Sequence, residues 1–235
     1  MGKKIGILVG GVILVFIVMA SVTIANNSRN PVYNFQTVAN RVMKMDFSGY
    51  DVDTIIPADT NSGNISEKIE GNPDAKVTIY EYADYACSHC AELNNVINKI
   101  VSDYDGKVKV VFRNYLINYF KNNAIVAHAA TAADLQGYWE PYKDKLFEEQ
   151  ATWYYKDSSE IRDYLGELFD EVTEGKGDKK KFYKDLDSEA VAKRVAFEFG
   201  LGAQIEEIEG TPYFRINGKA VAASELRSTI EELVK

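Results

Sequence analysis

The chain has 235 residues, of which 46% are hydrophobic and 26% charged, and its net charge at pH 7 is −8. That length suits one domain with additional segments. Without residues 1–25, whose charged side chains are Lys3 and Lys4, the net charge becomes −10. A chain this acidic has no basic stripe for nucleic acid, so we expect no nucleic-acid partner.

The N-terminus predicts a membrane anchor. Lys3 and Lys4 precede Ile5–Ala25, an uncharged stretch rich in Val and Ile that is long enough to span a bilayer. No clear A-x-A site follows it, so we predict an uncleaved signal anchor over residues 1–25, with a cleaved signal peptide as the alternative. The two lysines favour a cytoplasmic N-terminus, which places the remaining chain outside the cytoplasm, where disulfides persist.

Residues 26–73 form a polar stretch between this anchor and the folded domain. They are rich in Asn, Ser, Asp and Thr and are interrupted by Pro31, Pro57 and Pro73. Such a composition favours partial order over a packed core. We therefore predict a linker that lifts the domain off the membrane, with a short helix near Phe35–Met45.

Residues 74–235 show the periodicities of a globular α/β domain. In chain order we predict a strand over Val77–Ala83, a helix over Ser88–Tyr104, a strand over Lys107–Phe112, helices from about 122 to 201, strands over Tyr213–Ile216 and Lys219–Ala223, and a helix over 225–234. Asn217-Gly218 is a hairpin turn signal, and Ser224 is the expected cap of the last helix. This order predicts a thioredoxin fold with a helical insertion, at about 118–205, after the second strand.

Cys87-Ser88-His89-Cys90 contains both cysteines of the chain, and it lies where the first predicted strand leads into the first helix. A C-x-x-C in this position is typical of thioredoxin-like redox proteins. Unpaired N–H groups at the start of a helix stabilise an anion, so they favour the thiolate of Cys87. Cys90 lies one turn further and can close a disulfide with it.

A structural disulfide and a zinc site are two other roles that a cysteine pair can have. A structural disulfide would constrain the unfolded chain very little, because its loop is so short. A closed zinc site usually needs four Cys or His ligands, but the only histidines are His89 and His128. We therefore expect no metal and no cofactor besides a redox-active Cys87–Cys90 disulfide, while an inert pair stays the alternative.

Several motifs resemble those of DsbA-like thiol:disulfide oxidoreductases, in particular the membrane-anchored bacterial branch. They are Asp74–Ile79 before the first strand, Asp84–Cys90, Gln136–Trp139 followed by Leu146-Phe147, and Gly210–Phe214 with Asn217-Gly218. In family order they span residues 74–235. The resemblance implies the fold and a redox activity. Ser88 stands where family members often have Pro, which affects the expected reduction potential more than the activity.

The resemblance also implies roles for four further residues. Pro212 should follow a cis peptide bond beside the cysteines, so that Thr211 presents its backbone to the substrate; an ordinary trans proline at the start of a strand is the alternative. His89 should stabilise the Cys87 thiolate; a solvent-exposed histidine without a role is the alternative. Glu81 lies in an apolar strand, where a buried carboxylate is costly unless it serves proton transfer. We predict that Glu81 helps to move the proton of Cys90; a solvent-facing Glu81 is the alternative.

These observations predict an extracytoplasmic, membrane-tethered thiol oxidoreductase that donates its disulfide to unfolded exported proteins. Cys87 would be the attacked sulfur and Cys90 its partner. A reductase or isomerase on the same fold, and a redox-inactive peptide-binding or chaperone module, are the alternatives. We expect a monomer that is reoxidised by a membrane protein of the DsbB or vitamin K epoxide reductase type.

Overall fold

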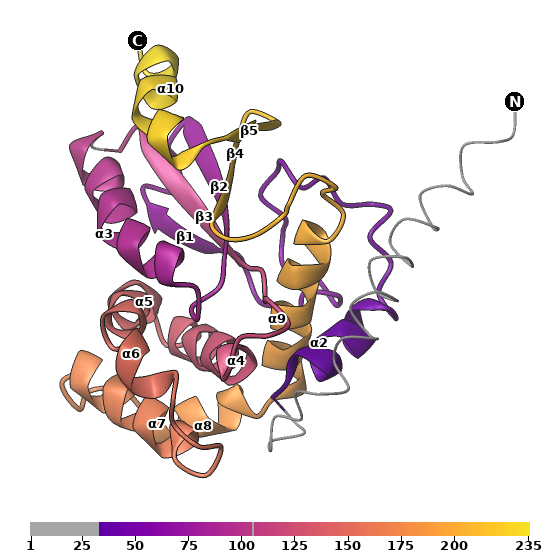
Figure 1. Ribbon diagram of the computed structural model, residues 1–235, viewed down its shortest axis with the longest axis vertical. Helices are drawn as coiled ribbons and strands as arrows, with labels where there is room; N and C mark the ends of the chain where they lie inside the picture. Colours follow the sequence, from indigo (N-terminus) through magenta and orange to yellow (C-terminus); the bar gives the residue numbers. More distant parts are fainter. Residues whose placement is uncertain (1–32, 105) are drawn as a thin grey trace, which may run out of the picture.

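The computed structural model describes residues 33–104 and 106–235, which fold around a five-stranded sheet (Figure 1). The strands are β1 (Lys68–Gly71), β2 (Val77–Ala83), β3 (Val108–Asn114), β4 (Tyr213–Ile216) and β5 (Lys219–Val221), and their order across the sheet is β1-β3-β2-β4-β5. β2 and β3 run parallel, and the other neighbouring pairs run antiparallel. The predicted strands are thus present, and β1 is an addition to them.

β2 is the central strand, and it carries the chain to the cysteines. Val77 lies opposite Val108 at its start, and Ala83 lies opposite Asn114 at its end. Nearly all its residues are buried because helices cover both faces of the sheet, which explains the continuous apolar run in the sequence. The chain leaves β2 at Ala83 and reaches the first turn of a helix at Ser88.

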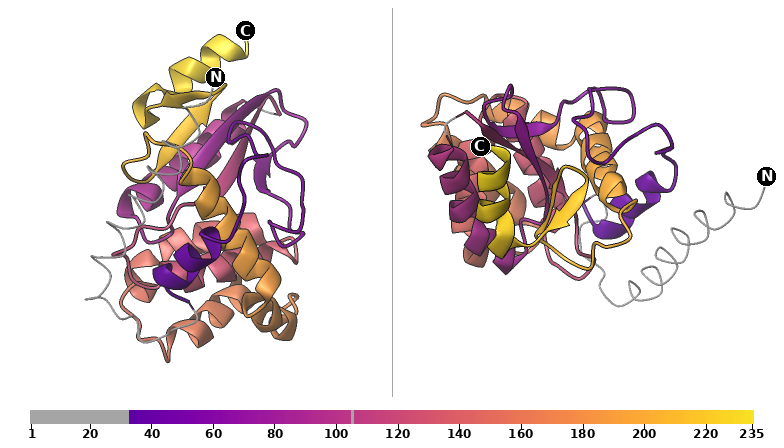
Figure 2. Two further views of the ribbon diagram at one scale, coloured as in Figure 1. Left: turned by 90° about the vertical axis from the view of Figure 1, so that its right-hand side faces the viewer. Right: turned by 90° about the horizontal axis from the view of Figure 1, so that it is seen from above.

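The helices form a layer on each face of the sheet and a cluster at one end. They are α2 (Phe35–Val42), α3 (Ser88–Asp103), α4 (Asn123–Asp134), α5 (Trp139–Glu148), α6 (Gln150–Trp153), α7 (Ile161–Val172), α8 (Lys179–Leu186), α9 (Glu189–Gly202), the 3-10 turn η2 (Ala223–Glu225) and α10 (Leu226–Leu233). α3 and α10 share a core with one sheet face, while α9 packs against β3 from the other. α4 to α8 gather at the opposite end of the sheet from α10 (Figures 1 and 2). This arrangement confirms the predicted α/β fold with a helical insertion after the strand that follows the cysteines.

The prediction of a polar linker over residues 26–73 is wrong for its described part, which begins at Tyr33. α2 packs against α9, and β1 pairs with β3 at the sheet edge. Ile56 and Ile65, between these elements, are also buried. Residues 33–73 therefore belong to the folded domain, and the expected short helix near Phe35–Met45 is α2.

Buried ion pairs explain why this segment is polar and still packed. Lys68 of β1 pairs with Glu198 of α9, and Glu67 accepts a hydrogen bond from Arg113 Nε at 2.6 Å. Charged residues can be buried when they are paired, so a polar composition does not exclude a core position. The polar composition of residues 26–73 is misleading because composition does not distinguish buried, paired charges from exposed ones.

Two further predictions concern the ends of the chain. The anchor predicted over residues 1–25 lies outside the described residues, and no helix within 33–104 or 106–235 is long and apolar enough to cross a membrane. The predicted cap at Ser224 is wrong, because Ser224 lies inside η2 and α10 begins at Leu226. No side chain caps that helix start.

Candidate active site

The two cysteines lie at the junction of β2 and α3, as predicted. Cys87 is the N-cap residue of α3, with an extended backbone, and Cys90 lies in the first turn. Both thiols are free and buried, with exposed fractions of 5% for Cys87 and 1% for Cys90. The Cys87 carbonyl accepts the first helical hydrogen bond, from Ala91 N at 3.2 Å. The first N–H groups of α3 are therefore left to face the Cys87 sulfur.

Their surroundings give the two thiols opposite acidities. A hydrogen bond with the Cys90 thiol, helped by Thr211 and by the N–H groups of Cys90 and His89, lowers the pKa of Cys87 to about 5. Burial, reinforced by the negative charge on Cys87, raises the pKa of Cys90 well above its ordinary value. At pH 7 Cys87 is consequently a thiolate and Cys90 a thiol, which makes Cys87 the nucleophile and the better leaving group.

Thr211 and Pro212 lie beside Cys87, as the resemblance implied. The peptide bond between them is cis, and Cys87 Sγ lies 3.2 Å from the Thr211 carbonyl oxygen. Apart from its interaction with the Cys87 sulfur, the buried Thr211 hydroxyl has no hydrogen-bond partner within the described part of the chain. The backbone of Thr211 thus forms one wall of the site, next to the sulfur that a substrate would reach.

Asp84 is a site residue that the sequence reasoning did not assign. Its side chain is fully buried and accepts hydrogen bonds from Ala86 N at 2.9 Å, Ile117 N at 2.7 Å and Asn123 Nδ2 at 2.9 Å. Burial raises the pKa of Asp84 to about 7, although these hydrogen bonds oppose the rise. An Asp that bonds to the N–H two residues later forms an Asx turn, and this was the signal available in the sequence.

Glu81 is buried in β2, which excludes the alternative of a solvent-facing side chain. Burial raises the pKa of this carboxyl to about 7, with the charge of Lys143 opposing the rise and Glu70 reinforcing it. Its negative charge in turn contributes to the raised pKa of Cys90. Glu81 is therefore electrostatically coupled to Cys90 and able to exchange a proton near neutral pH.

Lys143 and Glu70 form a buried ion pair near Glu81, between α5 and β1. Lys143 Nζ also donates to Asn98 Oδ1 at 2.8 Å and lies 5.5 Å from the centre of the Trp139 ring. This pair could not be predicted from the sequence, because its members are far apart in the chain and one belongs to the segment predicted to be a linker.

His89 occupies the first turn of α3 with an exposed side chain. Its backbone N–H contributes to the low pKa of Cys87, but within the described residues its ring makes no hydrogen bond. The prediction that the imidazole stabilises the thiolate therefore depends on its charge alone and stays a prediction.

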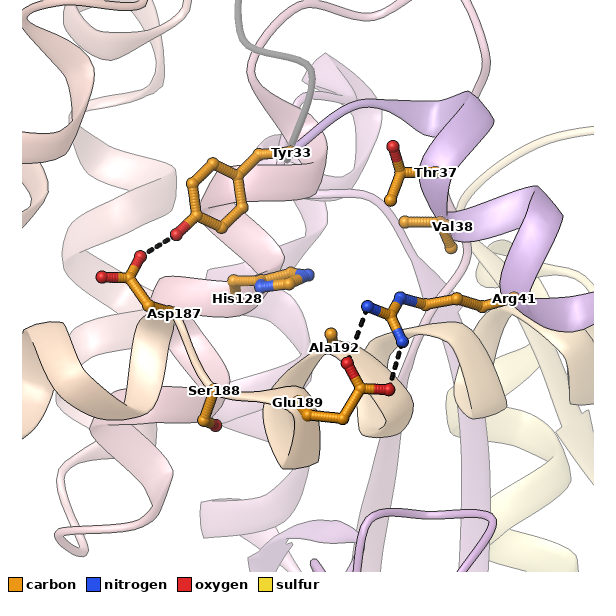
Figure 3. A pocket seen from close by; sticks show the side chains of 9 residues that line it. All are labelled: Tyr33, Thr37, Val38, Arg41, His128, Asp187, Ser188, Glu189 and Ala192. Carbon is orange, nitrogen blue, oxygen red and sulfur yellow. Dashed lines mark hydrogen bonds and ion pairs between the residues drawn. The ribbon is translucent and has the colours of Figure 1, made fainter.

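A pocket of about 280 Å³ lies elsewhere, between α2, α4 and the start of α9 (Figure 3). Arg41 and Glu189 form an ion pair across it, and Tyr33 donates a hydrogen bond to Asp187. His128 is buried at its wall, and burial lowers the pKa of this imidazole to about 4. None of the residues that line the pocket belongs to the cysteine site.

The described residues contain no group of three or more His, Cys, Asp or Glu side chains that could hold a metal ion. The site itself brings together two thiols of unequal acidity, the Thr211 backbone beside Cys87, and the buried carboxyls of Asp84 and Glu81.

Comparisons with known proteins agree with this chemistry. Residues 64–235 match the thioredoxin family. Disulfide bond formation protein D of Bacillus subtilis is 30% identical over 193 residues, which cover 75% of this chain and 82% of that protein. The crystal structure of oxidised BdbD from Bacillus subtilis superposes with a TM-score of 0.61, at 24% identity, over 77% of this chain and 97% of that chain.

The Na(+)/H(+) antiporter NhaA of Herminiimonas arsenicoxydans is also similar, at 27% identity over 158 residues, or 67% of this chain. This chain spans only 23% of that antiporter's length. The thioredoxin match covers most of the chain, and it includes the cysteines, Asp84 and the cis-proline. The chain therefore belongs to the thioredoxin family, and disulfide bond formation protein D is among its relatives.

Proposed function

We propose that this chain is a protein thiol:disulfide oxidoreductase that oxidises exported proteins outside the cytoplasm. The observation that carries the proposal is the unequal acidity of the two cysteines. The pKa of Cys87 is lowered to about 5, whereas that of Cys90 is raised. A stable Cys87 thiolate favours the reduced form of the protein, so the oxidised form is a strong acceptor of electrons from substrate thiols.

The first step is attack by a substrate thiolate on Cys87 Sγ of the Cys87–Cys90 disulfide. The bond between the two protein sulfurs breaks, a mixed disulfide forms between the substrate and Cys87, and Cys90 leaves as a thiolate. Cys90 then takes up a proton, because its buried position disfavours the charge. Glu81 is the proposed donor of that proton.

In the second step another substrate thiolate attacks the substrate sulfur of the mixed disulfide. The substrate leaves with a new disulfide, and Cys87 leaves as a stabilised thiolate. Two electrons have passed from the substrate to the protein. Thr211 lines the site beside the sulfur, and its backbone is the proposed contact for the unfolded substrate chain.

The reduced protein must then pass its two electrons on. Disulfide bond formation protein D is a relative, and a membrane-bound partner of the DsbB or vitamin K epoxide reductase type suits a protein held at the membrane by residues 1–25. Fractionation tests the tether: the intact protein should pellet with membranes and resist alkaline extraction, whereas a mature N-terminus near residue 25 would indicate a cleaved signal peptide.

A redox titration against glutathione tests the direction of the reaction. We expect a potential above that of thioredoxin, which is about −270 mV, and therefore shifted toward that of DsbA, about −120 mV. A potential at or below the thioredoxin value would contradict the oxidase and support a reductase on the same fold.

Cysteine variants test the roles of the two sulfurs. Cys90→Ser should accumulate mixed disulfides between Cys87 and client proteins, because the resolving thiol is absent. Cys87→Ser should accumulate few mixed disulfides and should lose activity. Non-reducing gels of cells that express each variant provide the measurement, and the opposite pattern would reverse the assigned roles.

A further inference from the structure

Gln150 connects the helical insertion to the turn that carries Cys87. It is the first residue of α6, and its side-chain Nε2 donates two hydrogen bonds. One reaches the Tyr85 carbonyl oxygen at 2.7 Å, and the other reaches the Cys87 carbonyl oxygen at 3.0 Å. A single amide therefore bridges the carbonyl two residues before the reactive cysteine and the carbonyl of the cysteine itself.

We call residues Asp84–Cys87 the catalytic turn, and its backbone is held from two sides. The Asp84 carboxylate accepts from Ala86 N, and the Asp84 carbonyl accepts from Cys87 N at 3.0 Å. These bonds occupy the N–H groups of Ala86 and Cys87, while Gln150 donates to the carbonyls of Tyr85 and Cys87. Without Gln150 no side chain in the described part of the protein would donate to either carbonyl oxygen.

The helical insertion also contacts the side chain of Tyr85, which lies in the middle of this turn. Trp139 Nε1 of α5 donates to the Tyr85 hydroxyl at 3.0 Å, and the Phe147 ring lies 5.2 Å from the Tyr85 ring. These contacts hold the turn against α5, but they do not fix the direction of its carbonyls. That direction depends on Gln150.

We propose that Gln150 is a positioning residue, which orients the catalytic turn so that the first N–H groups of α3 face Cys87 Sγ. The inference rests on the proposed function and deepens it, since it assigns the helical insertion a part in activating Cys87. Gln150 touches neither sulfur. It acts through the Cys87 carbonyl oxygen, which accepts from Ala91 N at 3.2 Å and from Gln150 Nε2 at 3.0 Å; the Gln150 donor offsets part of the negative charge of this oxygen next to the thiolate.

The variant Gln150→Met tests the proposal, because it keeps the length of the side chain and removes both donors. We expect the pKa of the Cys87 thiol to rise by about 0.5–1 unit, as for the loss of a neutral hydrogen bond. The measurement is the pH dependence of thiolate absorbance and of Cys87 alkylation in the reduced protein. Gln150→Asn, whose amide is one methylene too short, should show a rise in the same direction.

Gln136→Met is the matched control. The Gln136 amide also lies in the helical insertion and donates to a backbone carbonyl, that of Asp178 at 3.1 Å, but the residue is not among those bonded to the catalytic turn. This control should leave the pKa of Cys87 unchanged, and thermal unfolding verifies that each variant is folded.

Four outcomes would contradict these proposals. An unchanged pKa in Gln150→Met, or an equal rise in Gln136→Met, overturns the role of Gln150. If Gln150→Met does not fold, an unchanged pKa in Gln150→Asn overturns it instead. An ordinary pKa in the unsubstituted protein contradicts the proposed oxidase function itself, so the two failures are distinguishable.

Discussion

Cys87 and Cys90 are separated by two residues, yet their sulfurs differ in what surrounds them. Cys87 caps α3 and meets N–H groups and the edge of the cis-proline loop, whereas Cys90 is enclosed by apolar groups and faces the charge of Glu81. Dipoles that point at a sulfur stabilise its negative form, and burial without such dipoles destabilises it. The division of roles between the two cysteines therefore follows from one turn of helix.

Glu81 provides a prediction at this scale. Its folded-state pKa of about 7 lies above the ordinary value of 4.5, so its stabilising effect is complete below pH 4.5 and is lost as pH rises through 7. Glu81→Gln removes this dependence. The free energy of unfolding of the variant, relative to the parent protein, should increase by about 2–3 kcal/mol between pH 5 and pH 8.

Urea unfolding of the oxidised proteins at the two pH values measures this difference. Glu92→Gln, at an exposed position of α3, is the control and should show no such trend. A pH-independent difference for Glu81→Gln would mean that Glu81 does not titrate in this range, and its role in moving the Cys90 proton would be lost. The variant should also slow the release of Cys90 in the first step of exchange.

Residues close in sequence were predictable, and residues brought together by tertiary structure were not. The motif and its place before a helix identified Cys87 and Cys90, and the resemblance placed Thr211 and Pro212 next to them. Lys143 and Gln150 lie more than fifty residues from the motif, on helices of the insertion. No spacing rule connects them to the cysteines, because their positions depend on how α5 and α6 pack.

At the scale of elements, β2 and β4 have the predicted bounds, because strong apolar runs end at clear turns. α2 and β1 were missed as parts of the fold. For α2 the signal was present: Asn34 caps the helix by accepting from Thr37 N at 2.8 Å, and Phe35, Val38, Ala39 and Val42 form one buried face. For β1 there was little signal, since it is short and its charged residues are buried by pairing.

Glu198 of α9 connects these elements, and it supports a second prediction. It accepts from Arg194 Nε at 2.8 Å, from the Asn114 amide at the end of β3, and from Lys68 of β1. Burial alone would raise the pKa of Glu198, but the charges of Lys68 and Arg194 lower this pKa to about 2. Its contribution to stability is therefore present above pH 4.5 and is lost as pH falls toward 2.

Glu198→Gln should destabilise the protein by about 3–5 kcal/mol at pH 7, because it leaves the buried Lys68 ammonium without its anion and leaves Arg194 with only the Glu67 carboxylate, at 3.7 Å. Denaturant unfolding measures the loss. Glu206→Gln, at an exposed position, is the control and should change stability by less than about 0.5 kcal/mol. A loss as small as that of the control would show that β1 and α9 are held together by apolar packing, with the charges making no net contribution.

At the scale of the whole molecule, redox state and stability are coupled through the charge on Cys87. In the reduced protein the folded structure stabilises the thiolate, and the unfolded chain does not. Closing the disulfide removes that charge, and so short a loop restricts the unfolded chain only slightly. The reduced form should therefore be the more stable one, and the difference in folding free energy drives electrons from substrate to protein.

The sign and size of this difference follow from the pKa of Cys87. The folded value of about 5 lies below the ordinary 9.0, so the stabilisation is complete above pH 9 and disappears as pH falls through 5. Two units separate pH 7 from the folded value, which corresponds to about 2.7 kcal/mol before solvent screening and about 1–2 kcal/mol after it. A free-energy difference of about 1–2 kcal/mol shifts the reduction potential by roughly 20–45 mV toward more oxidising values. Cys90 is protonated at pH 7 in both the folded and the unfolded reduced protein, so it contributes nothing to this stability difference.

Thermal unfolding of the reduced and oxidised proteins at pH 7 and pH 4.5 provides the test. The reduced protein should melt at the higher temperature at pH 7, and most of the gap should close at pH 4.5. His89→Ala keeps the backbone N–H and removes the imidazole, so a narrower gap in that variant would support a role for the ring's charge. If the oxidised protein melts higher at pH 7, the thiolate does not drive the reaction toward oxidation. The protein would then act as a reductase, and a membrane partner that supplies electrons, in place of one that removes them, would be required.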